Sequence, residues 1–209
     1  MKYPFVTIAS PFLLAALALV AAPVGESTLT ASSSESHMQF QFDLDAGVPG
    51  FAVSDRFRSA ASGSFCSAEF EKTTSHGSKK VDDKETFDPN TGTVTRGSGA
   101  GQSEINTNTC GKDALAFLYF LRRELSQGRV PSRQTVFYGA PYEIRLESAG
   151  TENVKIANKP MDTDHVKASL DGPSSSIKFE LFFLQDKART LALVRVPLAL
   201  GTFSMELAK

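Results

Sequence analysis

Tryptophan is absent from this 209-residue chain, and cysteine and histidine number only two and three. Exposed aromatic rings are the surfaces on which sugars usually stack, so the lack of tryptophan disfavours polysaccharide binding. The histidines, His37, His76 and His165, are scattered, and none lies at metal-ligand spacing from a cysteine. We therefore expect no metal site and no cofactor.

An excess of either charge is also lacking. Lys and Arg number 22 against 23 Asp and Glu, which gives a formal net charge of −1. A chain this close to neutral has no basic stripe for phosphate backbones, so we expect no nucleic-acid partner. The nucleophile motif G-x-S-x-G does not occur. The glycine-rich segment 97–101 neither follows an apolar strand nor precedes a helix, which favours a flexible connection over a nucleotide-binding loop.

Long apolar runs are confined to the N-terminus. Lys2 precedes a nearly continuous apolar stretch over residues 5–22, which ends in small residues. Because this is the layout of a secretory leader, we predict a signal peptide over residues 1–25 and export to the periplasm or the cell exterior. An uncleaved anchor is the alternative, since a membrane span needs about 20 apolar residues. After signal removal we expect no membrane span.

Composition changes twice after the leader. Residues 26–37 are small and polar, which predicts a flexible tether. The two cysteines, Cys66 and Cys110, are predicted to form a disulfide, the default for a lone pair in an exported protein. Two separate buried thiols are the alternative.

One helix is predicted over residues 113–126. Asp113 is a good N-cap, Gly128 follows the last turn, and apolar residues recur at helical spacing: Ala114, Phe117, Leu118, Leu121 and Leu125. Elsewhere apolar and polar residues alternate, as in residues 38–44 and 177–184, which is typical of half-buried strands. Residues 38–209 are therefore expected to form a single, mainly β domain. Its twisted antiparallel sheet is half-open or barrel-like, and the helix packs against it.

The C-terminal strands allow a prediction of register. If Leu184 faces Leu191 across the loop 185–190, Glu180 faces Arg195 on the neighbouring strand. Opposite charges in that position predict a cross-strand ion pair.

The same hairpin places an apolar patch on the face opposite the predicted core. Such a patch is either covered by the helix or open to an apolar ligand, and covering by the helix is the favoured interpretation. The patch consists of Phe182, Leu184, Leu191 and Leu193.

Residues 112–122, KDALAFLYFLR, resemble the D-x-L-x-x-L-Y-x-L-R helix of the bacterial domain of unknown function 3108 family. The C-terminus resembles the family's ending, which has a strand, an acidic turn, a second strand and a Gly-x-x-x-x-x-Leu finish over residues 201–207. The resemblance covers residues 110–209. It implies an exported, mostly antiparallel β protein with no established activity, and it supplies no catalytic residues.

Two groups of polar residues are candidates for a catalytic or a metal-binding site. Glu69 and Glu71 lie on one face of a predicted strand, as paired carboxylates do in some enzymes. Asp162, Asp164 and His165 are the tightest cluster of metal-type ligands. Adjacent residues of a strand point to opposite faces, however, and neighbouring carboxylates on a solvated strand are common. We assign neither group a site.

Two hypotheses about function remain. The favoured one is an exported, non-catalytic binding or scaffolding module for an apolar ligand, a lipid or an envelope protein. The alternative is an envelope hydrolase with an active site assembled from loops. A pocket that joins Asp162 or Glu69 to a histidine would favour the alternative.

Overall fold

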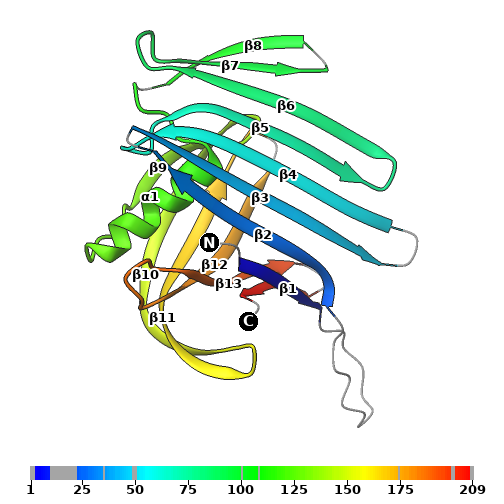
Figure 1. The fold of residues 1–209 in the computed structure, drawn as a ribbon, viewed down its shortest axis with the longest axis vertical. Coiled ribbons are helices and arrows are strands. Elements are labelled where there is room, and N and C mark those ends of the chain that lie inside the picture. Colours follow the sequence, from blue (N-terminus) through cyan, green and yellow to red (C-terminus); the bar gives the residue numbers. More distant parts are fainter. Residues whose placement is uncertain are drawn as a thin grey trace.

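The computed structural model describes residues 3–9, 23–34, 36–48, 51–99, 101–107, 109–173, 175–198 and 201–207. These form a 14-stranded antiparallel sheet and one α-helix, in the arrangement of Figure 1. The elements are β1 (Tyr3–Ala9), β2 (Pro23–Ser33), β3 (His37–Val48), β4 (Phe51–Ser62), β5 (Ser67–His76), β6 (Lys79–Asp88), β7 (Thr93–Ser98), β8 (Gly101–Asn106), α1 (Ala114–Ser126), β9 (Arg133–Phe137), β10 (Pro141–Ile156), β11 (Lys159–Asp171), β12 (Ser176–Leu184), β13 (Leu191–Leu198) and β14 (Gly201–Leu207).

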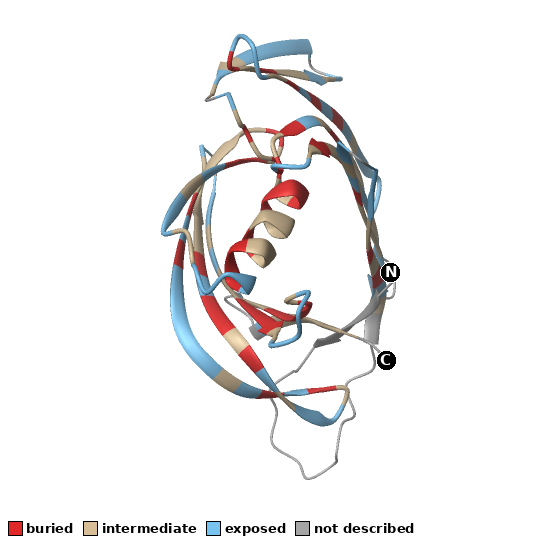
Figure 2. Ribbon diagram, turned by 60° about the vertical axis from the view of Figure 1, so that its left-hand side comes forward, coloured by how far each residue is buried: buried red, intermediate tan, exposed pale blue. Residues whose placement is uncertain are grey.

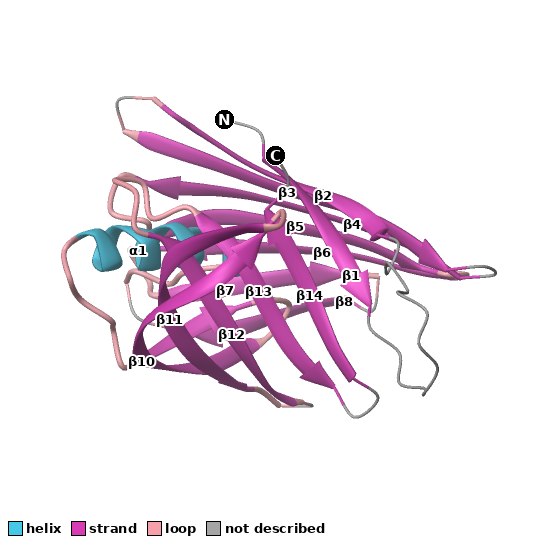
Figure 3. Cartoon of the chain, turned by 90° about the horizontal axis from the view of Figure 1, so that it is seen from below, coloured by secondary structure: helices cyan, strands magenta, loops and turns pink. Residues whose placement is uncertain are grey.

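The sheet curls around the helix without closing. Its strand order runs from β8 through β2, β1 and β14 to β9, so β8 and β9 are the two edges. Figure 2 shows α1 inside the curve, and Figure 3 shows it at one end of the curved sheet. The predicted mainly β, half-open fold with one principal helix is therefore confirmed.

The helix forms where its sequence predicts it. Asp113 is the N-cap, and its side chain accepts hydrogen bonds from the first-turn amides. Gly128 follows the helix with φ of 72°, a conformation that glycine adopts at little cost. Phe117, Leu121 and Leu125 are buried against residues of β9–β13, whereas Leu115 and Ala116 pack with residues of β2–β7.

The predicted flexible tether over residues 26–37 is wrong, because Pro23–Ser33 form strand β2. Leu29 pairs with Phe42 of β3 and is buried in the core. An antiparallel strand with one face in water needs few apolar residues, and threonine and serine fill its other positions. The signal peptide stays a prediction: residues 3–9 form β1 between β2 and β14, and residues 10–22 lie outside the described chain.

The register of the last hairpin agrees with the sequence at one end only. Glu180 lies opposite Arg195, as predicted. The predicted pairing of Leu184 with Leu191 is wrong, since a β-bulge shifts the register and brings Phe183 opposite Leu191. An extra residue in one strand also turns the side chains beyond it to the other face.

This bulge divides the predicted apolar patch. Leu191 faces the core that contains the helix, whereas Phe182 and Leu193 face outward, with half-buried Leu184 packed beside them. The prediction that the helix covers the patch is therefore wrong for the outward part. Figure 1 shows the long β10–β11 hairpin, which curls at its end, and a bulge between Ser148 and Gly150 interrupts its ladder. Apolar residues from the hairpin end cover the outward part: Val154, Ile156 and Met161.

Candidate functional site

An apolar cavity of about 290 Å³ lies between the helix and the inner face of the sheet. Both halves of the sheet contribute to its wall, from β2–β4 on one side and from β9–β14 on the other. The lining residues are Leu29, Phe42, Phe57, Ala114, Leu115, Phe117, Leu118, Leu121, Val136, Tyr138, Tyr142, Ile144, Leu170, Phe179, Leu181, Leu191, Val194 and Met205.

Several large side chains of this wall are only half-buried although they point into the curve of the sheet. Examples are Phe42, Phe57, Leu170, Phe179 and Met205. Protein interiors are normally packed as densely as organic crystals, so inward side chains that retain solvent contact indicate unfilled space. At about 30 Å³ per water-sized group, the cavity has room for roughly ten methylene groups.

Two tyrosines are the polar side chains of the lining. Tyr138 packs edge-on against Phe57, with ring centroids 5.4 Å apart. The ammonium group of Lys72 lies 4.4 Å from the centre of the Tyr138 ring. Burial raises the pKa of Tyr138 above its ordinary value, so this hydroxyl stays protonated. The lining residues therefore carry no charge, and the surface they present to the cavity is almost wholly apolar.

The helix is fixed above the cavity by a fully paired buried carboxylate. Asp113 has no exposed surface, and its Oδ1 accepts hydrogen bonds from the amides of Leu115 and Ala116. Its Oδ2 accepts from the hydroxyls of Ser59 and Ser67, each at 2.6 Å. Burial raises the pKa of Asp113, and these hydrogen bonds oppose that rise.

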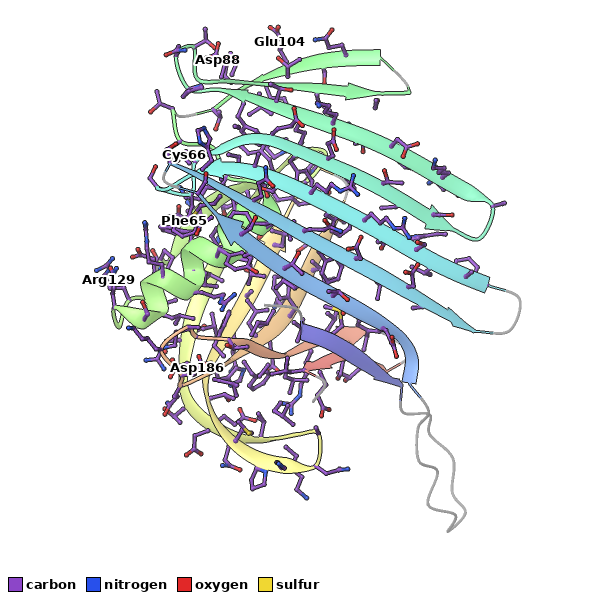
Figure 4. All side chains as sticks on the ribbon, in the orientation of Figure 1. Phe65, Cys66, Asp88, Glu104, Arg129 and Asp186 are labelled. Atoms are coloured by element: carbon purple, nitrogen blue, oxygen red, sulfur yellow. A yellow bond between two sulfur atoms is a disulfide. The ribbon has the colours of Figure 1, made fainter. Side chains whose placement is uncertain are left out.

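The segment that enters the helix also joins the two halves of the sheet. The amide of Ser67, on β5, donates to the carbonyl of Gly111, and the amide of Phe137, on β9, donates to the carbonyl of Lys112. The predicted disulfide between Cys66 and Cys110 is present beside this segment (Cys66 is labelled in Figure 4). Residues 111–113 thus bridge the free edge of β9 to β5.

Next to this bridge, four charged side chains from β5, β6 and β7 lie against the turn between β9 and β10. We call Lys72, Asp83, Glu85 and Arg96 the seam cluster. Asp83 is nearly buried and pairs with both cations, at 3.2 Å from Lys72 Nζ and 2.9 Å from Arg96 Nη2. The turn contributes Gly139, where a Cβ would lie 3.0 Å from Lys72 Nζ. The absence of a side chain at this position lets the turn rest directly on the seam cluster.

Glu85 is the unpaired member of the seam cluster. It is 0% exposed, and neither carboxylate oxygen has a side-chain hydrogen-bond partner among the described residues. Burial is the largest influence and raises the pKa of Glu85 to about 7, while a backbone hydrogen bond from the amide of Gly139 lowers it. Asp113 raises the pKa further, and Lys72 and Arg96 lower it.

The carboxylates considered from sequence lie away from the cavity. Glu69 and Glu71 both pair with Lys84 across the neighbouring strand, at 2.8 and 3.1 Å. Asp162 accepts a hydrogen bond from the side-chain amide (Nδ2) of Asn153. In the described part of the chain neither Glu69 nor Asp162 is joined to a histidine, which was the arrangement that would favour a hydrolase.

Asp164 and His165 point to opposite sides of β11. Asp164 pairs with Arg189 at 3.2 Å, and His165 stacks on Phe182 and pairs with Glu152 at 2.9 Å. Within the described ranges, no group of three or more histidine, cysteine or acidic side chains is arranged to hold a metal ion.

The predicted ion pair between Glu180 and Arg195 is replaced by a larger network. The two residues lie opposite each other, but Glu180 approaches His165 at 3.4 Å and Arg195 approaches Glu152 at 3.7 Å. Arg195 also lies 4.6 Å from the centre of the Phe182 ring. His165 and Arg195 thus both pack on the ring of Phe182, which has no exposed surface.

The sequence prediction missed the seam cluster. Its signal was available in β6, where Asp83 and Glu85 alternate with exposed residues and occupy the same face as Phe87. The overall polarity of residues 75–88 concealed that alternation, because charged residues rarely occupy the inward positions of a strand.

The family model described as "Protein of unknown function (DUF3108)" matches residues 17–208. The chain belongs to the DUF3108 family. A similar solved structure is the beta-barrel-like protein of domain of unknown function DUF1849 from Brucella abortus, with a TM-score of 0.66 and 8% sequence identity over 100% of this chain and 95% of that one. At that identity the likeness concerns the fold alone.

No curated protein matches this DUF3108 member. Its helix α1 has 13 residues, and in the described part of the chain no helix has the length and apolarity to cross a bilayer.

Proposed function

We propose that this DUF3108 protein is an exported binding module that holds one apolar chain, such as the acyl chain of a lipid, in the apolar cavity. The leader-like sequence of residues 1–22 supports export. The disulfide is in keeping with an oxidising compartment.

The unfilled, wholly apolar lining of the cavity carries this proposal. Ligand pockets typically measure about 300–1,000 Å³ and are lined by hydrophobic side chains with a few polar groups. The cavity, at about 290 Å³, lies at the small end of that range and suits one chain of roughly ten carbon atoms. Because its polar lining groups are the tyrosines Tyr138 and Tyr142, a charged headgroup would remain outside.

The absence of tryptophan provides a direct test. Phe179→Trp places a single indole in the cavity wall, and Phe51→Trp places one on an exposed strand end, where the natural side chain is 49% exposed. Both variants are titrated with 12-bromododecan-1-ol, an uncharged chain whose bromine quenches indole fluorescence on contact. We expect saturable quenching of Phe179→Trp and only weak, linear quenching of Phe51→Trp.

A second substitution tests where the chain binds. In the Phe179→Trp background, Leu170→Phe adds volume to the cavity wall. Filling a hydrophobic pocket in this way is expected to weaken binding about tenfold or more. Equal, non-saturable quenching of the two tryptophan variants would remove the proposed function.

A further inference from the structure

We infer that the seam cluster is a proton-dependent closure of the apolar cavity: the Tyr138 turn stays closed over Glu85 while Glu85 is protonated, and loss of the proton loosens the turn and speeds ligand release. This inference rests on the proposed binding of an apolar chain and assigns that site its regulation.

The turn between β9 and β10 lines the cavity and also contacts the seam cluster. Tyr138 lines the cavity, and its ring also contacts Lys72 of the seam cluster. Gly139 rests against Lys72 and Asp83. A movement of this turn away from β5 and β6 therefore opens the cavity wall at Tyr138.

The turn has few backbone contacts to resist such a movement. Among the described residues, β9 pairs with β10 alone, apart from an isolated bridge between Phe137 and Asp113. The bridge joins Phe137, the last residue of β9, to the segment beside the disulfide, so it fixes the start of the turn. Beyond Phe137, the position of the turn depends on side-chain packing and on the charges of the seam cluster.

The charges that face Glu85 leave it without a side chain of opposite charge to pair with. Lys72 comes from β5, Arg96 from β7 and Asp113 from the start of α1, while Asp83 precedes Glu85 on β6. Asp83 pairs with both cations, and Asp113 already accepts four hydrogen bonds. With Glu85 protonated, the two cations, Lys72 and Arg96, balance the two anions, Asp83 and Asp113. With Glu85 ionised, a buried unpaired carboxylate is added, which is strongly unfavourable.

Opening the turn admits water to Glu85 and removes this penalty. An exposed glutamate has a pKa near 4.3, whereas burial raises the pKa of Glu85 to about 7. The closed form is therefore favoured at low pH, and its advantage declines as pH rises from about 4.5 to about 7. Linkage limits the change in the closed-to-open ratio to about tenfold between pH 6 and pH 8.

The experiment measures the release of 12-bromododecan-1-ol from the Phe179→Trp protein. The probe is uncharged, so its own ionisation contributes nothing. Loaded protein is mixed in a stopped-flow instrument with excess unbrominated dodecan-1-ol, and the recovery of fluorescence is followed from pH 5.5 to pH 8.5. We expect the release rate to rise between pH 6 and pH 8, by at most about tenfold.

Three variants in the same background identify the responsible group. Glu85→Gln and Glu85→Leu remove the ionisation and should release slowly at every pH. Glu69→Gln removes a half-exposed carboxylate that pairs with Lys84 on the strand surface, and should keep the parent profile. Two independent replacements at Glu85 keep the test valid if one of them does not fold.

The possible outcomes separate the two claims. Saturable binding with a release rate that does not change with pH overturns the proton-dependent closure and leaves the binding function intact. The same holds if the pH dependence persists in the foldable Glu85 variants. If no saturable quenching occurs at any pH, the binding function fails and the closure fails with it.

Discussion

Replacing Glu85 with glutamine should make the protein more stable at alkaline pH. Glu85→Gln keeps the shape of the side chain and removes its ionisation at a position that is 0% exposed. A pKa raised from 4.5 to about 7 corresponds to about 3 kcal/mol of preference for the protonated form in the folded state. That value is the largest gain the substitution can provide.

The pH range of the effect follows from linkage. The folded protein holds the Glu85 proton more tightly than the unfolded chain does, so between about pH 4.5 and pH 7 it binds more protons. The free energy of unfolding therefore falls as pH rises through this range and stays lowered above about pH 7. Glu85→Gln should match the parent near pH 4.5 and exceed it by up to about 3 kcal/mol at pH 8.

Urea unfolding followed by circular dichroism, at half-unit steps from pH 4.5 to pH 8.5, measures this difference. The slope with urea must stay constant for the midpoints to be compared. Glu69→Gln is the matched control, because it removes a carboxylate from a solvated strand face, and its curve should run parallel to that of the parent. A Glu85→Gln protein less stable than the parent at pH 8 would refute the reasoning, since it would mean that the carboxylate is paired.

Two further substitutions test the packing around the cavity. Asp113→Ala removes the helix N-cap and the carboxylate that accepts hydrogen bonds from the hydroxyls of Ser59 and Ser67. Urea unfolding should therefore show a loss of about 3 kcal/mol, and a loss under about 1 kcal/mol would contradict the anchoring role. Phe182→Ala should cost about 3–5 kcal/mol and leave quenching of Phe179→Trp unchanged, whereas weaker quenching would restore the outward patch as a ligand surface.

Local sequence patterns were sufficient for the helix and for part of the C-terminal register. Asp113 and Gly128 bound the helix because capping depends on a few neighbouring residues. Glu180 and Arg195 lie opposite each other because alternation with period two sets the pairing over a short hairpin. The disulfide followed from compartment and cysteine count, without any geometric information.

The remaining features depend on residues distant in sequence. The bulge that brings Phe183 opposite Leu191 leaves no local signal, yet it moves Leu191 from the outer face to the core. Strand β2 is polar in composition and is stabilised by pairing with β3, which a local pattern does not record. The inward position of Glu85 follows from alternation with Phe87 on β6, but the charges that surround Glu85 come from other elements.

An open sheet that curls around a helix must hold its seam by means other than a continuous ladder of backbone hydrogen bonds. In this protein the upper part of the seam uses residues 111–113, which bond to both β5 and β9 beside the disulfide. The lower part uses the seam cluster, in which one of two buried carboxylates has no side-chain partner. An unpaired buried carboxylate is a poor way to maximise stability, since an apolar residue would serve better. It is a suitable way to make one part of a wall weaker than the rest, and that part is where Tyr138 separates the apolar cavity from the charges.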